Sequence, residues 1–332
     1  MSILLTGASG YLAQFVIEEL ARGEHASTLS IAACYWTTPL VLPPAVTSAF
    51  ASVSTHSVNL TDDAAVASLL DSLPSIDVVI HTAAMTSIDA CEKAPEDAAA
   101  TNCPTAFLEA LRDRTSSTAF LYTSTDIIFD GEAAPYAETA PGDASPLNTY
   151  GRTKLAFESA LAARWSGRYA ILRLSNMLGP PSPFAPRRSK FLQWLDGALG
   201  GDDDSVTLFA EEVRSFVAVT DVAALLVLLA VRHLDGTTAP SDAVVVHCGG
   251  VEGLSRAALA RRLAALRGHT VEGRIVETTR AAAAAAKGVA LAFASPCDVT
   301  MDSTKMRSLL HDMGDHYAAA LSTEAMLERA FR

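Results

Sequence analysis

The stretch TGASGYLA, Thr6 to Ala13, joins an apolar segment of strand length, SILLTG, to a segment of helical period, YLAQFVIEELARG. Glycines at positions 7 and 10 let the chain turn tightly and bring its backbone close to a pyrophosphate, whose charge the start of the following helix stabilises. Alanine at position 13 takes the third small position, where the helix must approach the sheet. The stretch therefore predicts a dinucleotide-binding turn. The residues expected to contact the dinucleotide are Gly7, Ser9, Gly10, Tyr11 and Leu12.

Apolar runs of strand length and segments of helical period alternate after this turn. Further strands are expected in LSIAACY, FASVSTHSVN, IDVVIHTAA, TAFLYTST and RYAILRLS. Helices are expected in TDDAAVASLLDSL, with Thr61 as its N-cap, in APEDAAATNCPTAFLEALRDR as one long helix, and around Tyr150 to Arg164. The alternation predicts an α/β fold of the Rossmann type, a doubly wound parallel sheet with helices on both faces.

The texture of the sequence changes after Gly179, where PPSPFAPRRSK is rich in proline and basic residues. A second, smaller lobe that binds the substrate is expected to begin there and to be interleaved with the first domain. The expected division is a dinucleotide-binding domain over 1–175, with 211–248 returning to it, a substrate lobe over 176–210 and 249–310, and a C-terminal extension over 311–332.

Composition and charge limit the class of protein. The chain has 332 residues, of which 50% are hydrophobic and 19% charged, as in globular proteins. Its 37 acidic and 25 basic residues give a net charge of -12, which argues against binding to nucleic acid or an anionic membrane. The apolar run from Val222 to Val231 is about half the roughly 20 residues that a membrane span needs, and predicts a buried helix.

The five cysteines are scattered without the CxxC spacing of a zinc site, so no metal site is expected. The same scatter gives no disulfide framework, and no signal peptide precedes the first strand. We therefore expect the protein to be cytoplasmic. The sequence does not predict an oligomeric state.

Tyr150 and Lys154 lie four residues apart in NTYGRTKLAFE and therefore share one face of a helix. A phenol has a pKa of about 10, and a neighbouring ammonium group lowers it. Such a pair suits general acid–base catalysis at a carbonyl or an alcohol, although the spacing alone also fits an exposed helix face. LYTSTDIIFDG adds Ser124, Thr125 and Asp126 at the end of a strand, at the sheet edge where open α/β folds bind ligands.

The glycine turn, the strand-end hydroxyls and the Tyr–Lys helix together resemble an extended short-chain dehydrogenase/reductase. Within that class the chain resembles the dTDP-4-dehydrorhamnose reductase family, which includes the regulatory β subunit of methionine adenosyltransferase. The resemblance runs through TGASGYLAQ, HTAAMTSIDACEKAPEDAAATN, STDIIFDG, PLNTYGRTKLAFE and ILRLSNMLGP, and it weakens from VRSFVAVTDVA to about Leu310. The residues after Leu310, which include His311 and His316, are expected to lie beyond it.

The resemblance implies roles for single residues. Tyr150 would protonate the alkoxide that forms as hydride reaches a sugar 4-keto carbon, and Lys154 would bind the nicotinamide ribose. Thr125 would orient the carbonyl oxygen, with Asp126 and Ser124 beside it. Further cofactor contacts are implied for Leu60, Ala83, Ala84 and Asn102.

The end of the second strand bears on the choice of cofactor. It reads CYWTTP, with neither the acid that binds ribose hydroxyls nor an arginine for a 2′-phosphate. The missing acid favours NADP (NADPH), with Thr37 facing the 2′-phosphate and NAD as the alternative.

A nucleotide-sugar substrate would need cations for its diphosphate, because guanidinium groups match phosphate geometry. The candidates are Arg187, Arg188 and Lys190 in the variable lobe and Arg214 in EVRSF. The cluster from Arg187 to Lys190 fits a solvated charged surface equally well.

Two departures from the family pattern fall where the substrate would bind. Met85 stands where the bacterial reductases carry a tyrosine, and Ser295 replaces an arginine before proline.

Two functions remain open: an NADP-dependent reductase of a 4-keto-6-deoxy nucleotide sugar, and a regulatory subunit that binds the dinucleotide without turnover. The second would have a methionine adenosyltransferase catalytic subunit as its partner. Epimerase or dehydratase chemistry ranks third.

Overall fold

The centre of the protein is a seven-stranded sheet in which every paired strand is parallel, in the order β11-β6-β5-β4-β1-β2-β3. The computed structural model describes residues 1–331 apart from 115–116, 140–143, 202–204, 237–242 and 313–321. The sheet strands are β1 (Ser2–Thr6), β2 (Ser30–Tyr35), β3 (Ser52–Ser57), β4 (Val78–His81), β5 (Ala119–Thr125), β6 (Tyr169–Leu174) and β11 (Ala243–Cys248).

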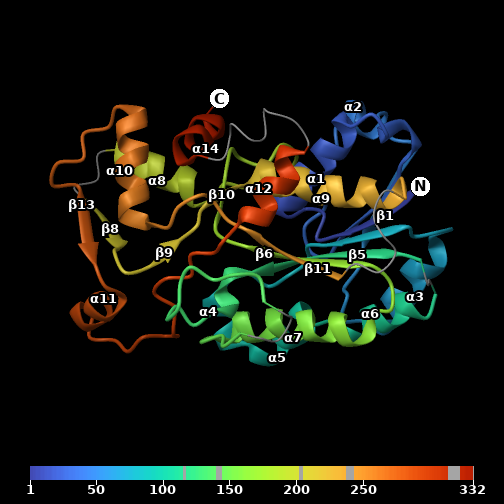
Figure 1. The fold of residues 1–332 in the computed structure, drawn as a ribbon, viewed down its shortest axis with the longest axis horizontal. Helices are drawn as coiled ribbons and strands as arrows, with labels where there is room; N and C mark the ends of the chain where they lie inside the picture. The colour runs from blue at the N-terminus through green and yellow to red at the C-terminus, as the bar shows by residue number, and fades with distance from the viewer. Residues whose placement is uncertain (115–116, 140–143, 202–204, 237–242, 313–321, 332) are drawn as a thin grey trace.

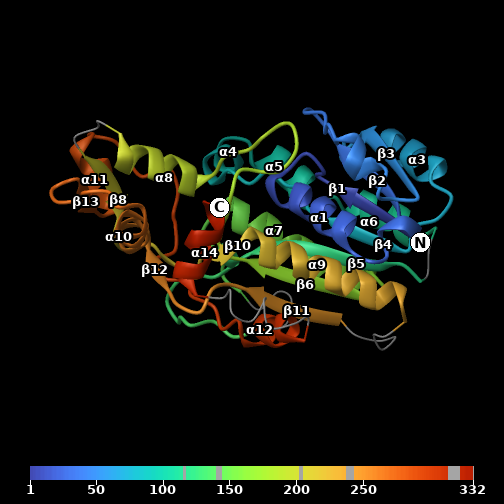
Figure 2. The same cartoon turned by 90° about the horizontal axis from the view of Figure 1, so that it is seen from above.

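Helices cover both faces of this sheet (Figures 1 and 2). One face carries α1 (Tyr11–Arg22), α9 (Val219–Leu234) and α12 (Thr304–His311). The other carries α3 (Asp63–Ser72), α4 (Ile88–Lys93), α5 (Pro95–Asn102), α6 (Thr105–Arg112) and α7 (Thr149–Arg164). Side chains alternate between the two cores, as a strand requires: Ile3 and Leu5 pack on the α1 side and Leu4 on the opposite side. The predicted doubly wound Rossmann-type fold is confirmed.

A third hydrophobic core lies beyond the end of the sheet, on the left in Figure 1. Its elements are α8 (Phe191–Gly200), β8 (Val206–Phe209), β12 (Leu254–Ser255), α10 (Arg256–Arg267), β13 (Ile275–Thr278) and α14 (Thr323–Ala330). Between these, the chain returns to the sheet as α9, which lies against α1, and as β11, which pairs with β6. The predicted domain boundaries stay a prediction.

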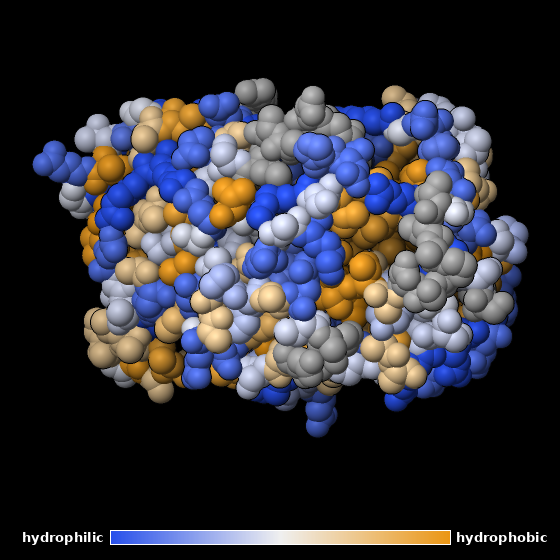
Figure 3. Space-filling view, viewed as in Figure 1, coloured by the Kyte–Doolittle hydropathy of each residue, from blue (hydrophilic) through white to orange (hydrophobic). Residues whose placement is uncertain are grey.

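The other helices and strands are short: η1 (Ala26–Thr28), α2 (Pro44–Thr47), η2 (Asp126–Ile128), β7 (Met177–Leu178), β9 (Val213–Arg214), β10 (Val217–Ala218) and α11 (Arg280–Ala286). The apolar run within α9 is buried as predicted, since Val222 to Val227 lie in the core on the α1 side. No helix in the described part of the chain is long and apolar enough to span a bilayer. The face shown in Figure 3 is mainly hydrophilic or intermediate in colour, with smaller hydrophobic areas.

Two local predictions were wrong. The N-cap of α3 is Asp62, whose carboxylate accepts hydrogen bonds from the backbone N–H groups of the first turn, whereas the Thr61 hydroxyl donates to Asn59. The single long helix is divided into α5 and α6, preceded by α4. The break falls at Pro104, which lacks the N–H that a continuous helix would use.

Candidate functional site

In the glycine turn between β1 and α1, the two glycines lie very close to neighbouring backbone atoms. Gly7 has a φ of +70°, and a Cβ added there would lie 2.7 Å from the backbone nitrogen of Ala83. A Cβ added to Gly10 would lie 2.8 Å from the carbonyl oxygen of Gly7. Only glycine fits position 7, because the backbone there is left-handed and lies against the backbone that follows β4. In Rossmann-type folds, glycine turns of this kind bring the backbone close to the diphosphate of a dinucleotide.

A cavity of about 830 Å³ opens at the carboxyl edge of the sheet and contains this turn. Ala83 and Ala84 follow β4 at its floor, and Trp36 and Thr37 follow β2 at one end. Most of the predicted site residues line it: Gly7, Ser9, Gly10, Tyr11, Leu12, Thr37, Leu60, Ala83, Ala84, Ser124, Thr125, Asp126, Tyr150, Lys154 and Arg214.

Three predicted site residues, Met85, Asn102 and Arg187, are absent from the described lining of this cavity. Asn102 is fully buried, accepts a hydrogen bond from the Met85 N–H at 2.7 Å, and donates to the Met85 carbonyl at 3.1 Å and to Thr153 at 3.1 Å. It therefore fastens the loop after β4 to helix α7. Arg187 is exposed.

Helix α7 carries Tyr150 and Lys154, and its N-cap Asn148 accepts a hydrogen bond from the N–H of Gly151 at 2.9 Å. Lys154 is only 2% exposed and its Nζ lies 4.4 Å from the centre of the Tyr122 ring. Burial lowers the pKa of Lys154 to about 7, against the opposing charge of Glu158.

The pKa of Tyr150 moves opposite to the prediction. Burial raises it, and the negative charge of Asp126 raises it further, while a hydrogen bond with Thr125 lowers it. The sequence indicated a lowered pKa because it showed the neighbouring cation but not the loss of water around the phenol. Tyr150 therefore keeps its proton at neutral pH.

The strand-end hydroxyls surround a buried carboxyl group. Asp126 accepts hydrogen bonds from Thr125 at 3.2 Å and from Ser175 at 2.8 Å. Burial raises the pKa of Asp126, while the charge of Arg214 and both hydroxyl groups oppose the rise. The Oγ of Ser124 is buried and has no hydrogen-bond partner among the described residues, so this hydroxyl is available to a ligand.

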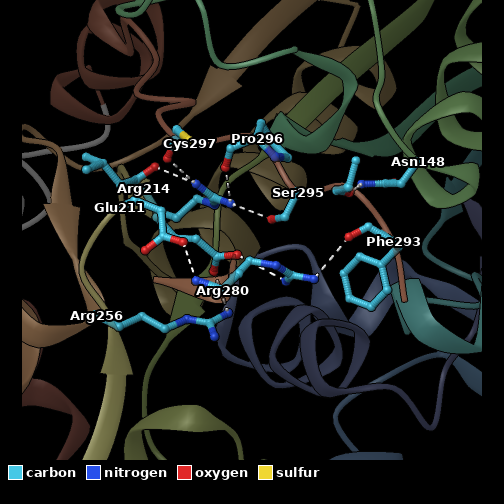
Figure 4. Close-up of polar contacts among 12 residues, drawn as sticks. Asn148, Glu211, Arg214, Arg256, Arg280, Phe293, Ser295, Pro296 and Cys297 are labelled. Carbon is cyan, nitrogen blue, oxygen red and sulfur yellow. Dashed lines mark hydrogen bonds and ion pairs between the residues drawn. The ribbon is translucent and has the colours of Figure 1, made fainter. Parts of the chain in front are cut away.

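Three arginines, Arg214, Arg256 and Arg280, line the cavity and lie close together (Figure 4). Arg214, the last residue of β9, donates to the carbonyl groups of Pro296 and Cys297, at 3.0 Å each. The sequence analysis missed the other two arginines, which Glu212 holds: Arg280 Nη1 lies 3.2 Å from one carboxylate oxygen and Arg256 Nη2 3.7 Å from the other. No sequence signal marked these two, because they lie 42 or more residues from Arg214 in the chain and follow ordinary helix caps.

The structure also locates the other cations and one of the histidines that the sequence singled out. Arg188 and Lys190 line the cavity, beside the glycine turn. The described residues hold no group of three or more His, Cys, Asp or Glu side chains able to bind a metal ion. His311, at the end of α12, is exposed, and His316 lies outside the described residues.

The parallel sheet, the glycine turn and the Tyr–Lys helix at the carboxyl edge define a Rossmann-type protein with the side-chain set of a short-chain dehydrogenase/reductase. The chain belongs to the family described as RmlD substrate binding domain, which matches residues 1–329. The match reaches beyond Leu310, where the sequence analysis placed the end of the resemblance. In that region Met326, Leu327 and Ala330 of α14 are buried in the third core.

Relatives in this family have different names. A Haloferax volcanii protein named "Probable low-salt glycan biosynthesis reductase Agl14" is 30% identical over 239 residues, 71% of this chain and 73% of the relative. Methionine adenosyltransferase 2 subunit beta of Xenopus tropicalis is 30% identical over 200 residues, 60% of this chain and 57% of that protein. The fold is that of the Bacillus anthracis dTDP-4-dehydrorhamnose reductase in complex with NADP, with a TM-score of 0.73 and 19% identity over 99% of this chain and 98% of that one.

Proposed function

We propose that this protein is an NADP-dependent reductase of a 4-keto-6-deoxy nucleotide sugar. The observation that carries the proposal is that Thr125, Tyr150 and Lys154 line the same cavity as the glycine turn. These are the side chains that carbonyl reduction needs: a proton donor, a hydroxyl for the carbonyl oxygen, and a cation for a ribose. The buried lysine and the fully buried network around Asp126 hold them in place.

The reaction adds one hydride to the carbonyl carbon and one proton to its oxygen. NADPH, when bound, supplies the hydride. Tyr150 donates the proton, and its raised pKa favours this direction because the phenol is fully protonated at neutral pH. Thr125 orients the carbonyl oxygen, and the unpartnered Ser124 hydroxyl offers a hydrogen bond to a substrate oxygen. Lys154 hydrogen-bonds the hydroxyl groups of the nicotinamide ribose.

The residues at the adenosine end of the cavity favour NADP and also accommodate NAD. The lining residues after β2 and β3 are neutral: Trp36, Thr37, Thr38, Asn59 and Leu60. Without a carboxylate there, a 2′-phosphate meets no repulsion, and the threonine hydroxyls can donate to it. The free 2′-hydroxyl group of NAD also meets no repulsion from these neutral side chains. We therefore propose NADP as the cofactor, with NAD as a weaker alternative.

The three arginines in the cavity wall support a substrate with a diphosphate. Arg214, Arg256 and Arg280 bring three guanidinium groups to the cavity wall, and Glu212 neutralises one of these charges. Glu211, whose carboxylate accepts a hydrogen bond from the Arg280 backbone N–H at 2.6 Å, adds a second negative charge. The group therefore keeps a net charge of about +1, which favours an anionic diphosphate. Arg280 also lies over the ring of Phe293, with its guanidinium carbon 4.3 Å from the ring centre, which fixes its orientation.

A second candidate function has its own support. The chain is similar to methionine adenosyltransferase β subunits, and Met85 and Ser295 depart from the reductase pattern. Ser295 has a hydroxyl group in place of a guanidinium group, and this hydroxyl accepts a hydrogen bond from Arg214 at 3.4 Å. In this alternative the protein is a regulatory subunit that binds NADP and a methionine adenosyltransferase catalytic subunit without turnover.

One experiment separates the two candidates. The purified protein is mixed with NADPH and dTDP-4-keto-6-deoxy-L-lyxo-hexose, and the nicotinamide absorbance is followed beside a Tyr150→Phe variant. Consumption in the wild type that falls about 100-fold or more in the variant supports the reductase, since general acid catalysis contributes factors of about this size. Binding of NADPH without consumption overturns it, and a pull-down with a methionine adenosyltransferase catalytic subunit then tests the alternative.

A further inference from the structure

The segment from Pro180 to Lys190 is fastened onto the glycine turn. The Tyr11 hydroxyl donates to the carbonyl of Pro180 at 2.8 Å. Gln14, which is fully buried, accepts from the Phe184 N–H at 2.9 Å and donates to the carbonyl groups of Ser9 at 3.2 Å and of Pro186 at 3.0 Å. These bonds connect residues about 170 positions apart in the chain, so the segment is held against the turn by buried polar contacts.

Arg188 is the cation that this fastening brings to the turn. Its Nε donates to the carbonyl oxygen of Ser9 at 2.8 Å. Its backbone is fixed by Ser182, whose Oγ accepts from the Arg188 N–H at 2.8 Å and whose own N–H donates to the Arg188 carbonyl at 3.1 Å. Within the described part of the chain, the two terminal nitrogens of Arg188 have no hydrogen-bond partner, and the side chain lines the cavity. Its remaining N–H donors are therefore available to a ligand.

Lys190 adds a second positive charge at the same place. Its Nζ lies 5.5 Å from the centre of the Tyr11 ring, at the first residue of α1, and the side chain lines the cavity. The turn itself, from Thr6 to Ala13, contains no charged residue. A doubly charged diphosphate on the turn would otherwise be stabilised by backbone N–H groups alone, in a protein of net charge -12.

The cavity thus has two groups of cations, each held by a different part of the chain. Arg214, Arg256 and Arg280 are held by Glu212 and the backbone from Pro296 to Cys297. Arg188 is held by Ser9 of the glycine turn. We propose that Arg188, assisted by Lys190, binds the diphosphate of the dinucleotide and not that of the nucleotide sugar. This inference rests on the dinucleotide binding of the proposed function, but it does not depend on turnover.

The test compares dissociation constants of the full-length protein for NADPH, measured by calorimetry without substrate. Arg188→Gln should weaken NADPH binding about 10- to 100-fold, because it removes a charged hydrogen-bond donor to phosphate. Arg187→Gln is the matched control: it removes the same charge one residue away, at an exposed side chain absent from the described lining, and should change the constant less than twofold. Lys190→Gln should weaken NADPH binding a few-fold.

Two further ligands separate recognition of phosphate from fastening of the segment. Adenosine carries no phosphate, so its weak binding should be equal in wild type and Arg188→Gln if Arg188 recognises the diphosphate. An equal loss for adenosine and NADPH would assign Arg188 a purely structural role and overturn the proposal. Loss of dTDP binding with unchanged NADPH binding would also overturn it, by returning Arg188 to the substrate. If wild type binds no NADPH at all, the cofactor of the proposed function fails together with this inference.

Discussion

The ion pair between Arg173 and Glu158 offers the sharpest test of how helix α7 is held. Both side chains are 0% exposed, and Arg173 Nη2 lies 2.7 Å from Glu158 Oε2. Arg173 comes from β6, whereas Glu158 lies on α7, four residues beyond Lys154. Arg173 also donates to the hydroxyl of Thr139 at 3.2 Å. The pair therefore joins the sheet to the helix that carries Tyr150 and Lys154.

Replacing Arg173 with methionine keeps most of the side-chain volume but leaves the Glu158 carboxylate buried without its counter-charge. A buried pair broken on one side costs about 3–5 kcal/mol, while replacing both partners with apolar residues is often nearly neutral. We therefore expect Arg173→Met to lower the free energy of unfolding by about 3–5 kcal/mol and the Arg173→Met/Glu158→Leu protein to recover most of that loss.

The assay is equilibrium unfolding in urea. A change in the urea midpoint at an unchanged slope of free energy against urea concentration reports stability, whereas a changed slope reports a change in the unfolded state. Glu158→Leu alone should also be strongly destabilising, because it leaves the guanidinium group of Arg173 buried without its carboxylate. The reasoning is refuted if Arg173→Met loses less than about 1 kcal/mol, or if the double variant loses the sum of the two single variants.

Three further predictions follow from the site. Gly7→Ala should abolish measurable NADPH binding, because a Cβ there clashes with the Ala83 backbone and the left-handed conformation costs about 1–2 kcal/mol more; retained affinity in calorimetry would contradict this. Burial lowers the Lys154 pKa from 10.5 to about 7, so between these values the unfolded chain binds a proton that the folded chain does not, and stability should rise with pH. Lys154→Met should flatten that rise in urea unfolding across the same window, and an unchanged slope would argue against the shift. Arg280→Gln should weaken dTDP binding about tenfold without changing NADPH binding, and equal losses for both ligands would place Arg280 elsewhere.

The features that could be predicted from the sequence are those carried by local patterns. The glycine turn, the strand-end hydroxyls and the Tyr–Lys spacing each occupy a few consecutive residues, and the parallel sheet brings them together at one edge. Arg256 and Arg280 could not be found in this way, because the second lobe brings them to the cavity from distant parts of the chain. The pKa of Tyr150 was misjudged for a similar reason, since burial depends on the packing of the whole domain.

The edge strand β11 determines how much of the chain is needed for a stable protein. Its residues Ala243 to Cys248 pair with Tyr169 to Leu174 of β6, long after the chain has left the sheet to build α8 and β8. A fragment that stops before Ala243 would leave the backbone N–H and C=O groups along the outer edge of β6 without partners, a surface on which other chains can add strands. Expression of the dinucleotide-binding half alone should therefore yield aggregates. We therefore expect the first six strands of the sheet to form a stable unit only after the nascent chain has passed Cys248.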